Sequence, residues 1–202
     1  MIIQLVDSNK QMCEAWESRF KGCNDVHVFH GDVFEKSCDC IISPANSFGF
    51  MDGGLDLLIS EIIGWHIEER LQKRIKEEHN GELLVGQAIL LETGFQQIPF
   101  LISAPTMRVP MILLKKDTVN VYLASRAIFI LLKQEQHRIY SVTISGLGTG
   151  VGQVPYDICA KQMKQAYDEV LLGQSTFPNT WHDAQVRHTS LFLDEHRDLQ
   201  KR

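Results

Sequence analysis

The sequence predicts a three-layer α/β fold built around a mixed central sheet. Short β-rich runs alternate with helical patterns along the chain, and several of these runs are apolar throughout, as expected for strands covered on both faces. In two places, at 26–43 and 86–106, two strand patterns follow each other with no helix between them. Such pairs favour a mixed sheet and disfavour a plain doubly wound order.

Six strands are expected from the β-rich runs. They lie at 2–7, 26–32, 38–43, 86–93, 100–106 and 140–146. The intervening segments have helical periodicity, so helices should form the two outer layers of the fold.

The first two helical segments carry start and break signals. Ser8 followed by Gln11 has the spacing of a capping box and predicts a helix that runs to about Phe20. The segment 55–78 is either one broken helix or two consecutive helices, with Gly64 as the expected break.

The later helices have their own start signals. Asp117 or Thr118 is expected to cap a helix that begins at about residue 119. Pro155 suits the first turn of a last long helix that ends near Leu172.

The composition is that of one ordinary folded domain. The chain has 202 residues, of which 44% are hydrophobic and 22% charged, with a net charge of -5. An acidic chain disfavours general binding to nucleic acid, although backbone N–H groups alone can form a local anion site. We also expect no membrane span, because no apolar run approaches the roughly 20 residues that one requires.

Cysteine usage predicts a cytoplasmic protein without disulfides. The five cysteines are odd in number, and no basic and then apolar leader precedes them. Cys38 and Cys40 have a spacing that would place both thiols on one face of a strand, which raises the possibility of a metal site. No second Cys or His pair accompanies them at zinc-site spacing, so we expect no metal.

Two glycine-rich segments follow expected strands and lead into expected helices: "SPANSFGFMDGGLD" at 43–56 and "GLGTGVGQVP" at 146–155. Loops at the carboxyl ends of strands form the ligand crevice of α/β proteins, so the two segments can converge on one diphosphate. Asn46 would then bind a sugar hydroxyl, and Asp56 would orient a water molecule or accept its proton. The alternative is purely structural, because glycine turns, Asn in loops and Asp at helix starts are common.

The combination of these motifs resembles the macro domain family. The likeness rests on Gly31-Asp32, on the two glycine-rich segments and on "GQAILLETG" at 86–94, and it covers about residues 1–171. Macro domains bind ADP-ribose, and some members hydrolyse ADP-ribosyl derivatives. The resemblance implies catalytic roles for Asn46 and Asp56. The ligand contacts that it implies are Asp32 (at the adenine amino group), Val33, Ala45, Asn46, Gly53, Gly54, Leu55, Gly146, Gly148, Thr149, Gly150, Val151 and Gly152.

The implied activity is removal of a substituent from C1″ of the distal ribose, with no metal or cofactor. The substrate would be an ADP-ribosyl ester on a modified protein, O-acetyl-ADP-ribose or ADP-ribose-1″-phosphate. The alternative is a non-catalytic reader or sequestering module for ADP-ribose or a signalling nucleotide. The expected partners are therefore this small molecule or an ADP-ribosylated protein that carries it, while the oligomeric state stays open.

The chain departs from the better-studied hydrolases at three places. Met51 and Asp52 interrupt a glycine run, Ser60 aligns with a His, and Gly152 aligns with an aromatic that packs on the distal ribose. These changes bear on catalysis more than on binding, because backbone groups hold the diphosphate whereas ribose position governs the reaction. Phe48 or Phe50 is a candidate to replace the aromatic, if neither packs on the domain itself.

Two further features have open interpretations. Arg108 is either a surface residue or a ligand of a terminal phosphate or carboxylate. Residues 1–172 are expected to form the macro-like domain, with 173–202 as a polar appendage that packs on it or trails from it.

Overall fold

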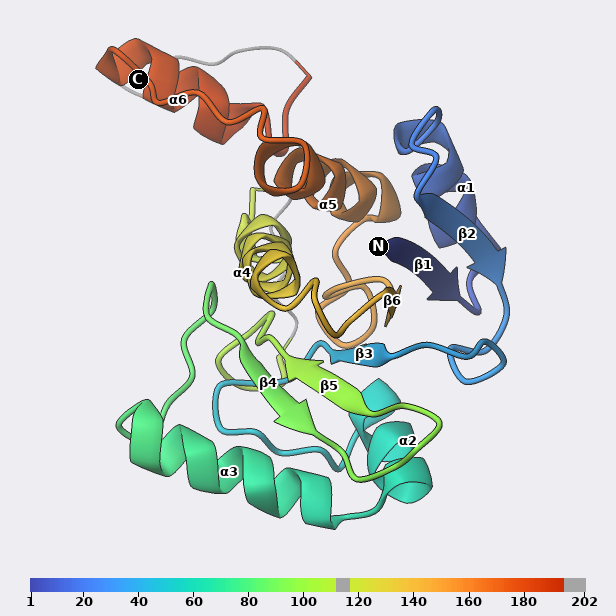
Figure 1. Cartoon of the computed structure of the whole chain (residues 1–202). Helices are drawn as coiled ribbons and strands as arrows, with labels where there is room; N and C mark the ends of the chain where they lie inside the picture. Colours follow the sequence, from blue (N-terminus) through green and yellow to red (C-terminus); the bar gives the residue numbers. More distant parts are fainter. Residues whose placement is uncertain (112–116, 195–202) are drawn as a thin grey trace.

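A six-stranded sheet runs through the middle of the molecule, with helices on both faces (Figure 1). The computed structural model describes residues 1–111 and 117–194. The strands are β1 (Ile2–Asp7), β2 (Val26–His30), β3 (Cys40–Ser43), β4 (Ile89–Glu92), β5 (Phe100–Ser103) and β6 (Ser141–Ile144). The helices are α1 (Lys10–Arg19), α2 (Gly54–Ile63), α3 (His66–Glu78), α4 (Asn120–Gln134), α5 (Tyr156–Val170) and α6 (Trp181–Thr189).

The strand order is β2-β1-β6-β3-β5-β4. All neighbouring pairs are parallel except β4 and β5, which are antiparallel, so the predicted mixed sheet is confirmed. Only one of the two helix-free strand pairs produces the antiparallel contact. β2 and β3 follow each other in the sequence, but β1 and β6 lie between them in the sheet.

Each face of the sheet has its own hydrophobic core. The larger core joins the sheet to α1, α4 and α5, where Trp16, Phe129 and Tyr167 are buried. The second core joins the other face to α2 and α3. In α3 the buried residues Ile67, Leu71 and Ile75 recur every four positions, which gives this helix one apolar face. The three predicted layers are therefore present (Figure 1).

The helix boundaries agree with the sequence at Gly64 and differ at Ser8. Gly64 separates α2 from α3 with φ of +114°, and a Cβ at this position would lie 2.7 Å from Nδ1 of His66. The predicted cap at Ser8 is wrong, because Asn9 is the N-cap of α1 and its side chain accepts from the N–H of Gln11. Ser and Asn are both preferred at the N-cap, so the sequence alone did not show whether Ser8 or Asn9 would cap the helix.

The later helices begin close to their predicted starts. Pro155 immediately precedes α5, while Val119 is the N-cap residue of α4. Neither predicted cap occupies that position, although Thr118 Oγ1 does accept from the N–H of Asn120 at 3.3 Å.

Cys38 and Cys40 do not share a face of the sheet, contrary to the prediction. The strand begins only at Cys40, so strand alternation does not apply to Cys38. Cys40 packs in the core with α1, α4 and α5, and Cys38 packs in the core with α2 and α3. Burial raises the pKa of both thiols.

The segment after α5 carries the helix α6. Thr180 and Asp183 form a capping box at its start, and Leu191 just after it is buried. Arg187 of α6 reaches Glu169 of α5 at 2.8 Å, and this carboxylate is almost fully buried. The last predicted appendage residues, 195–202, lie outside the described part.

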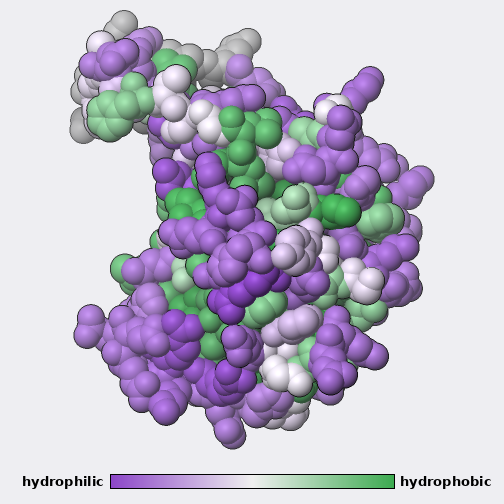
Figure 2. All heavy atoms as spheres, viewed as in Figure 1, coloured by the Kyte–Doolittle hydropathy of each residue, from purple (hydrophilic) through white to green (hydrophobic). Residues whose placement is uncertain are grey.

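Hydrophilic side chains cover most of the face drawn in Figure 2, with smaller apolar patches between them. Within the described residues, no helix combines the length and apolarity needed to cross a membrane.

Candidate functional site

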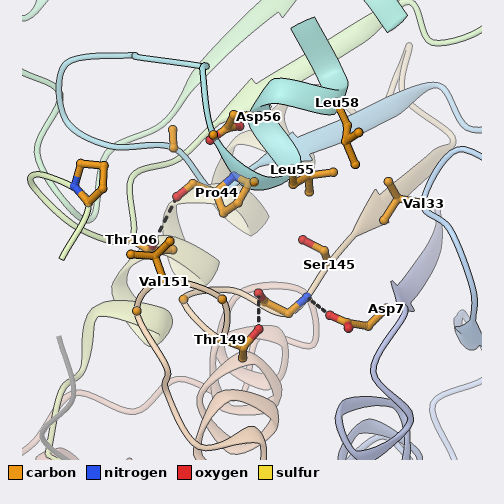
Figure 3. Close-up of a pocket in the computed structure, with 18 of the residues that line it drawn as sticks. Asp7, Val33, Pro44, Leu55, Asp56, Leu58, Thr106, Ser145, Thr149 and Val151 are labelled. Carbon is orange, nitrogen blue, oxygen red and sulfur yellow. Dashed lines mark hydrogen bonds between the residues drawn. The ribbon is translucent and has the colours of Figure 1, made fainter. Parts of the chain in front are cut away.

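One cavity of about 510 Å³ lies beyond the carboxyl ends of β1, β3 and β6. Its first wall is residues 44–53, here the first loop, together with the start of α2. Its second wall is residues 145–155, here the second loop. Figure 3 shows Asp56 and Leu55 of α2 on one side of the cavity and Thr149 of the second loop on the other.

Every catalytic or ligand-contact residue predicted from the sequence lies on this lining. These residues are Asp32, Val33, Ala45, Asn46, Gly53, Gly54, Leu55, Asp56, Gly146, Gly148, Thr149, Gly150, Val151 and Gly152. Two segments about 100 residues apart in the sequence therefore face each other across one space.

Asn46 shapes the first loop. Its Oδ1 accepts from the N–H groups of Phe48 and Phe50, and its Nδ2 donates to the carbonyl of Phe50. The side chain is nearly buried. Since an amide has two N–H donors, one donor remains for a ligand after these bonds.

Side chains from α2 and α3 hold the same loop from behind. Glu68 of α3 accepts from the N–H of Met51 at 2.5 Å, and Ser60 of α2 donates to the carbonyl of Met51 at 3.1 Å. Met51 is fully buried. Ser60 therefore serves to anchor the backbone of the first loop.

Asp56 brings a carboxyl group to the first wall from the first turn of α2. Its side chain is buried at 8% exposure, and its Oδ1 accepts from Ser43 Oγ at 2.5 Å. Burial raises the pKa of Asp56 to about 7, because water is removed from the charged form, and the Ser43 hydrogen bond offsets only part of this effect. At neutral pH this group can therefore either hold or accept a proton.

The start of α2 presents backbone donors to the same space. Gly53 is its N-cap and makes no side-chain capping bond. Gly53, Gly54 and Leu55 all line the cavity. The first N–H groups of a helix lack partners inside the helix and favour an anionic ligand.

The second loop is held mainly by its own backbone. The N–H of Val154 donates to the carbonyl of Gly148, and the N–H of Gln153 donates to the carbonyl of Gly150, both at 3.0 Å. A Cβ at Gly152 would lie 2.4 Å from the carbonyl oxygen of Gly148. This contact explains why position 152 has no side chain here.

Asp7 connects the second loop to β1. Its Oδ2 accepts from the N–H of Gly146 (Figure 3), and its Oδ1 accepts from the N–H of Asn9. Asp7, Thr106, Met107 and Ser145 line the cavity but were not identified from the sequence. The usable signal for Asp7 was its position, since it ends a strand parallel to β6.

The described lining is acidic. It contains Asp7, Asp32, Asp52 and Asp56, and it contains no Lys, Arg or His among the residues that the structure describes. An anionic ligand in this cavity would therefore depend on backbone N–H groups.

Arg108 is not among the residues that line the cavity. It forms an ion pair with Glu82 at 2.7 Å, and its guanidinium lies 5.1 Å from the centre of the Phe48 ring. The surface interpretation of Arg108 thus describes its position. Of the two candidate aromatics, Phe48 packs under Arg108, whereas Phe50 lines the cavity and is half exposed.

Asp32 follows β2 in the sequence and lines the cavity, as does Val33. It is exposed, and its Oδ1 accepts from the N–H of Phe34 at 2.9 Å. Across residues 1–111 and 117–194, no three His, Cys, Asp or Glu side chains gather in an arrangement suited to a metal ion.

The residues that form most of this site match the sequence model of a known family. The model of the macro domain family matches residues 42–163. A protein of Aquifex aeolicus is 34% identical over 139 residues, which are 69% of this chain and 78% of that protein. A protein of Pyrobaculum aerophilum is 28% identical over 146 residues, covering 72% of this chain and 76% of that protein.

Solved structures show the same fold. The macrodomain of Mycobacterium tuberculosis DarG has a TM-score of 0.60 at 18% identity and covers 70% of this chain and 88% of that chain. A mutant of the Oceanobacillus iheyensis macrodomain with ADPR has a TM-score of 0.60 at 21% identity and covers 80% of this chain and 86% of that chain.

Proposed function

The chain belongs to the macro domain family, and from this premise we propose that its cavity binds ADP-ribose and hydrolyses a substituent at C1″ of the distal ribose. The observation that supports this most directly is the convergence of two glycine-rich loops on one cavity with a buried carboxyl in its wall. The solved structure of the Oceanobacillus iheyensis macrodomain mutant with ADPR supports the same ligand class.

Binding would rest on the backbone. The N–H groups at the start of α2 and those of the second loop would take the diphosphate, since no described cationic side chain lines the cavity. Val33 and Asp32 would contact the adenine end, and Asn46 would offer its remaining N–H to the distal ribose. Phe50 is the aromatic side chain available to pack on that ribose.

In the reaction, a water oxygen forms a bond to C1″ while the bond from C1″ to the leaving oxygen breaks. The water proton passes to the Asp56 carboxylate and then to the leaving group, so no other reactant is needed. The substrate is an ADP-ribosyl ester, O-acetyl-ADP-ribose or ADP-ribose-1″-phosphate.

A reader without catalysis is the second candidate, and the bonds of Asn46 favour it. Its amide oxygen already accepts two N–H groups of its own loop, which limits its use as a ribose ligand. A reader would bind ADP-ribose through the same backbone groups and convert none of the three derivatives.

Calorimetry with ADP-ribose, followed by chromatography of each derivative incubated with the protein, tests both candidates. For an enzyme, Asp56→Asn should lower turnover by about 100-fold or more and change ADP-ribose affinity much less. Asp52→Asn is the matched control, because it removes the same charge from an exposed position on the same wall. Affinity without conversion would favour the reader, and absence of both would defeat the proposal.

A further inference from the structure

The Asp56 carboxyl is held by a single side chain of the sheet. Ser43 is the last residue of β3, and its hydroxyl donates to Oδ1 of Asp56 across the space between the sheet and α2. Ser43 is completely buried and Asp56 nearly so. Among the described residues, this is the only hydrogen bond that the Asp56 side chain makes.

The two oxygens of Asp56 are therefore not equivalent. Oδ1 is fixed on the sheet side by Ser43, and Oδ2 has no partner within the described protein. Asp56 also lines the cavity (Figure 3), so Oδ2 is the oxygen available to a bound molecule. Fixing one oxygen also fixes the rotation of the carboxyl group about its χ2 bond, which would otherwise be broad.

We infer that Ser43 is a positioning residue for the reaction proposed above: it fixes Oδ1 of Asp56 so that Oδ2 meets the attacking water. This inference rests on the proposed function for its catalytic meaning. The contact on which the inference is based does not depend on that function: a buried hydroxyl of Ser43 orients the buried carboxyl of Asp56.

The surroundings make Ser43 important for the charge of Asp56 as well. The other ionisable groups on the cavity lining are Asp7, Asp32 and Asp52, and Glu68 of α3 is bonded to the N–H of Met51. These groups are acidic, so none of them stabilises a negative charge. The Ser43 hydroxyl is the group that opposes the effect of burial on Asp56.

Ser103 provides a matched control on the neighbouring strand. It is the register partner of Ser43 in the β3–β5 pair and is also completely buried. Directly paired residues of neighbouring strands face the same side of a sheet. The Oγ of Ser103 has no hydrogen-bond partner, so Ser103→Ala removes an equivalent hydroxyl without disturbing Asp56.

The experiment compares Ser43→Ala, Ser43→Thr and Ser103→Ala with the wild-type chain, after thermal melting has established that each variant folds. The first readout is the Asp56 carboxyl titration by carbon NMR, without ligand. The second is the pH dependence of kcat/KM on the derivative that the wild type hydrolyses.

In Ser43→Ala, the pKa of Asp56 should rise by about one unit, which lowers kcat/KM about tenfold on the acidic side of the profile. Ser43→Thr, which keeps a hydroxyl, should restore the wild-type profile, and Ser103→Ala should retain it. An unchanged Asp56 titration in Ser43→Ala, or an equal shift in Ser103→Ala, would overturn the inference.

The two readouts separate the two proposals. If the wild type hydrolyses none of the derivatives, the proposed reaction fails, whereas the NMR titration still decides whether Ser43 controls the charge of Asp56. If hydrolysis occurs and the acidic limb does not move in Ser43→Ala, the reaction stands and the role of Ser43 is wrong.

Discussion

The two walls of the cavity are held in place by different means. The first wall depends on polar side chains, since Asn46, Ser60 and Glu68 bind the first loop and Ser43 binds Asp56. The second wall depends on backbone hydrogen bonds and on the close approach of Gly152 to Gly148. Substitutions in the first wall should therefore act through hydrogen bonding and ionisation, and substitutions in the second through steric fit.

The largest expected effect is on the pH dependence of folding stability, and it comes from Asp56 in the first wall. Because burial raises the pKa of Asp56 from 3.8 to about 7, the folded chain binds an extra proton between these values. The contribution of Asp56 to stability is then fully present below pH 4 and is lost as pH rises through 7, by on the order of 4 kcal/mol.

Asp56→Asn removes this contribution, so the stability of the variant relative to the wild type should increase from pH 4 to pH 8. Denaturant unfolding across this range measures it. Asp52→Asn should keep the wild-type pH dependence, since Asp52 is exposed. Parallel curves for Asp56→Asn and the wild type would contradict the assigned burial effect.

The next effect concerns the second wall. In Gly152→Ala the new Cβ would lie 2.4 Å from the carbonyl oxygen of Gly148. Because this oxygen belongs to the backbone, the clash can be relieved only if the loop moves. We expect a loss of about 1–3 kcal/mol of stability and at least tenfold weaker ADP-ribose binding, measured by melting and calorimetry. Gly150→Ala is the control for stability, because nothing in the protein lies within 4 Å of a Cβ there. An equal loss of stability in the two variants would show that steric fit does not define this wall.

The smallest expected effect concerns Glu68, which holds the first loop by a hydrogen bond but does not line the cavity. Glu68→Ala leaves the buried N–H of Met51 without its acceptor, which should cost about 1 kcal/mol and weaken ADP-ribose binding severalfold. Glu68→Gln retains an acceptor oxygen and should lie close to the wild type. If both variants bind ADP-ribose like the wild type, side-chain bracing does not shape the first wall.

The strands and their mixed pairing could be predicted because local patterns determine them. Apolar runs, their lengths and the missing helix before β5 are all visible in the sequence. The separation of β2 from β3 was not visible, because β1 and β6 enter between them from distant parts of the chain. Only contacts in three dimensions fix such an order.

The cavity lining could be predicted in part for the same reason. The glycine-rich loops and Asp56 have local signatures, whereas Asp7 and Ser43 act across the sheet and have none beyond their position at strand ends. The three hydrogen bonds of Asn46 to its own loop were also not evident, since Asn suits a ligand site and a turn equally well.

The position of β1 in the sheet has a practical consequence for the design of shorter fragments of this protein. The recognisable family segment starts at residue 42 and stops at 163, inside α5. A fragment with these limits would lack β1, whose neighbours on either side are β2 and β6, and with it the carboxylate that anchors Gly146. The stretch that matches the family model is thus shorter than the stretch that builds the sheet and the cavity.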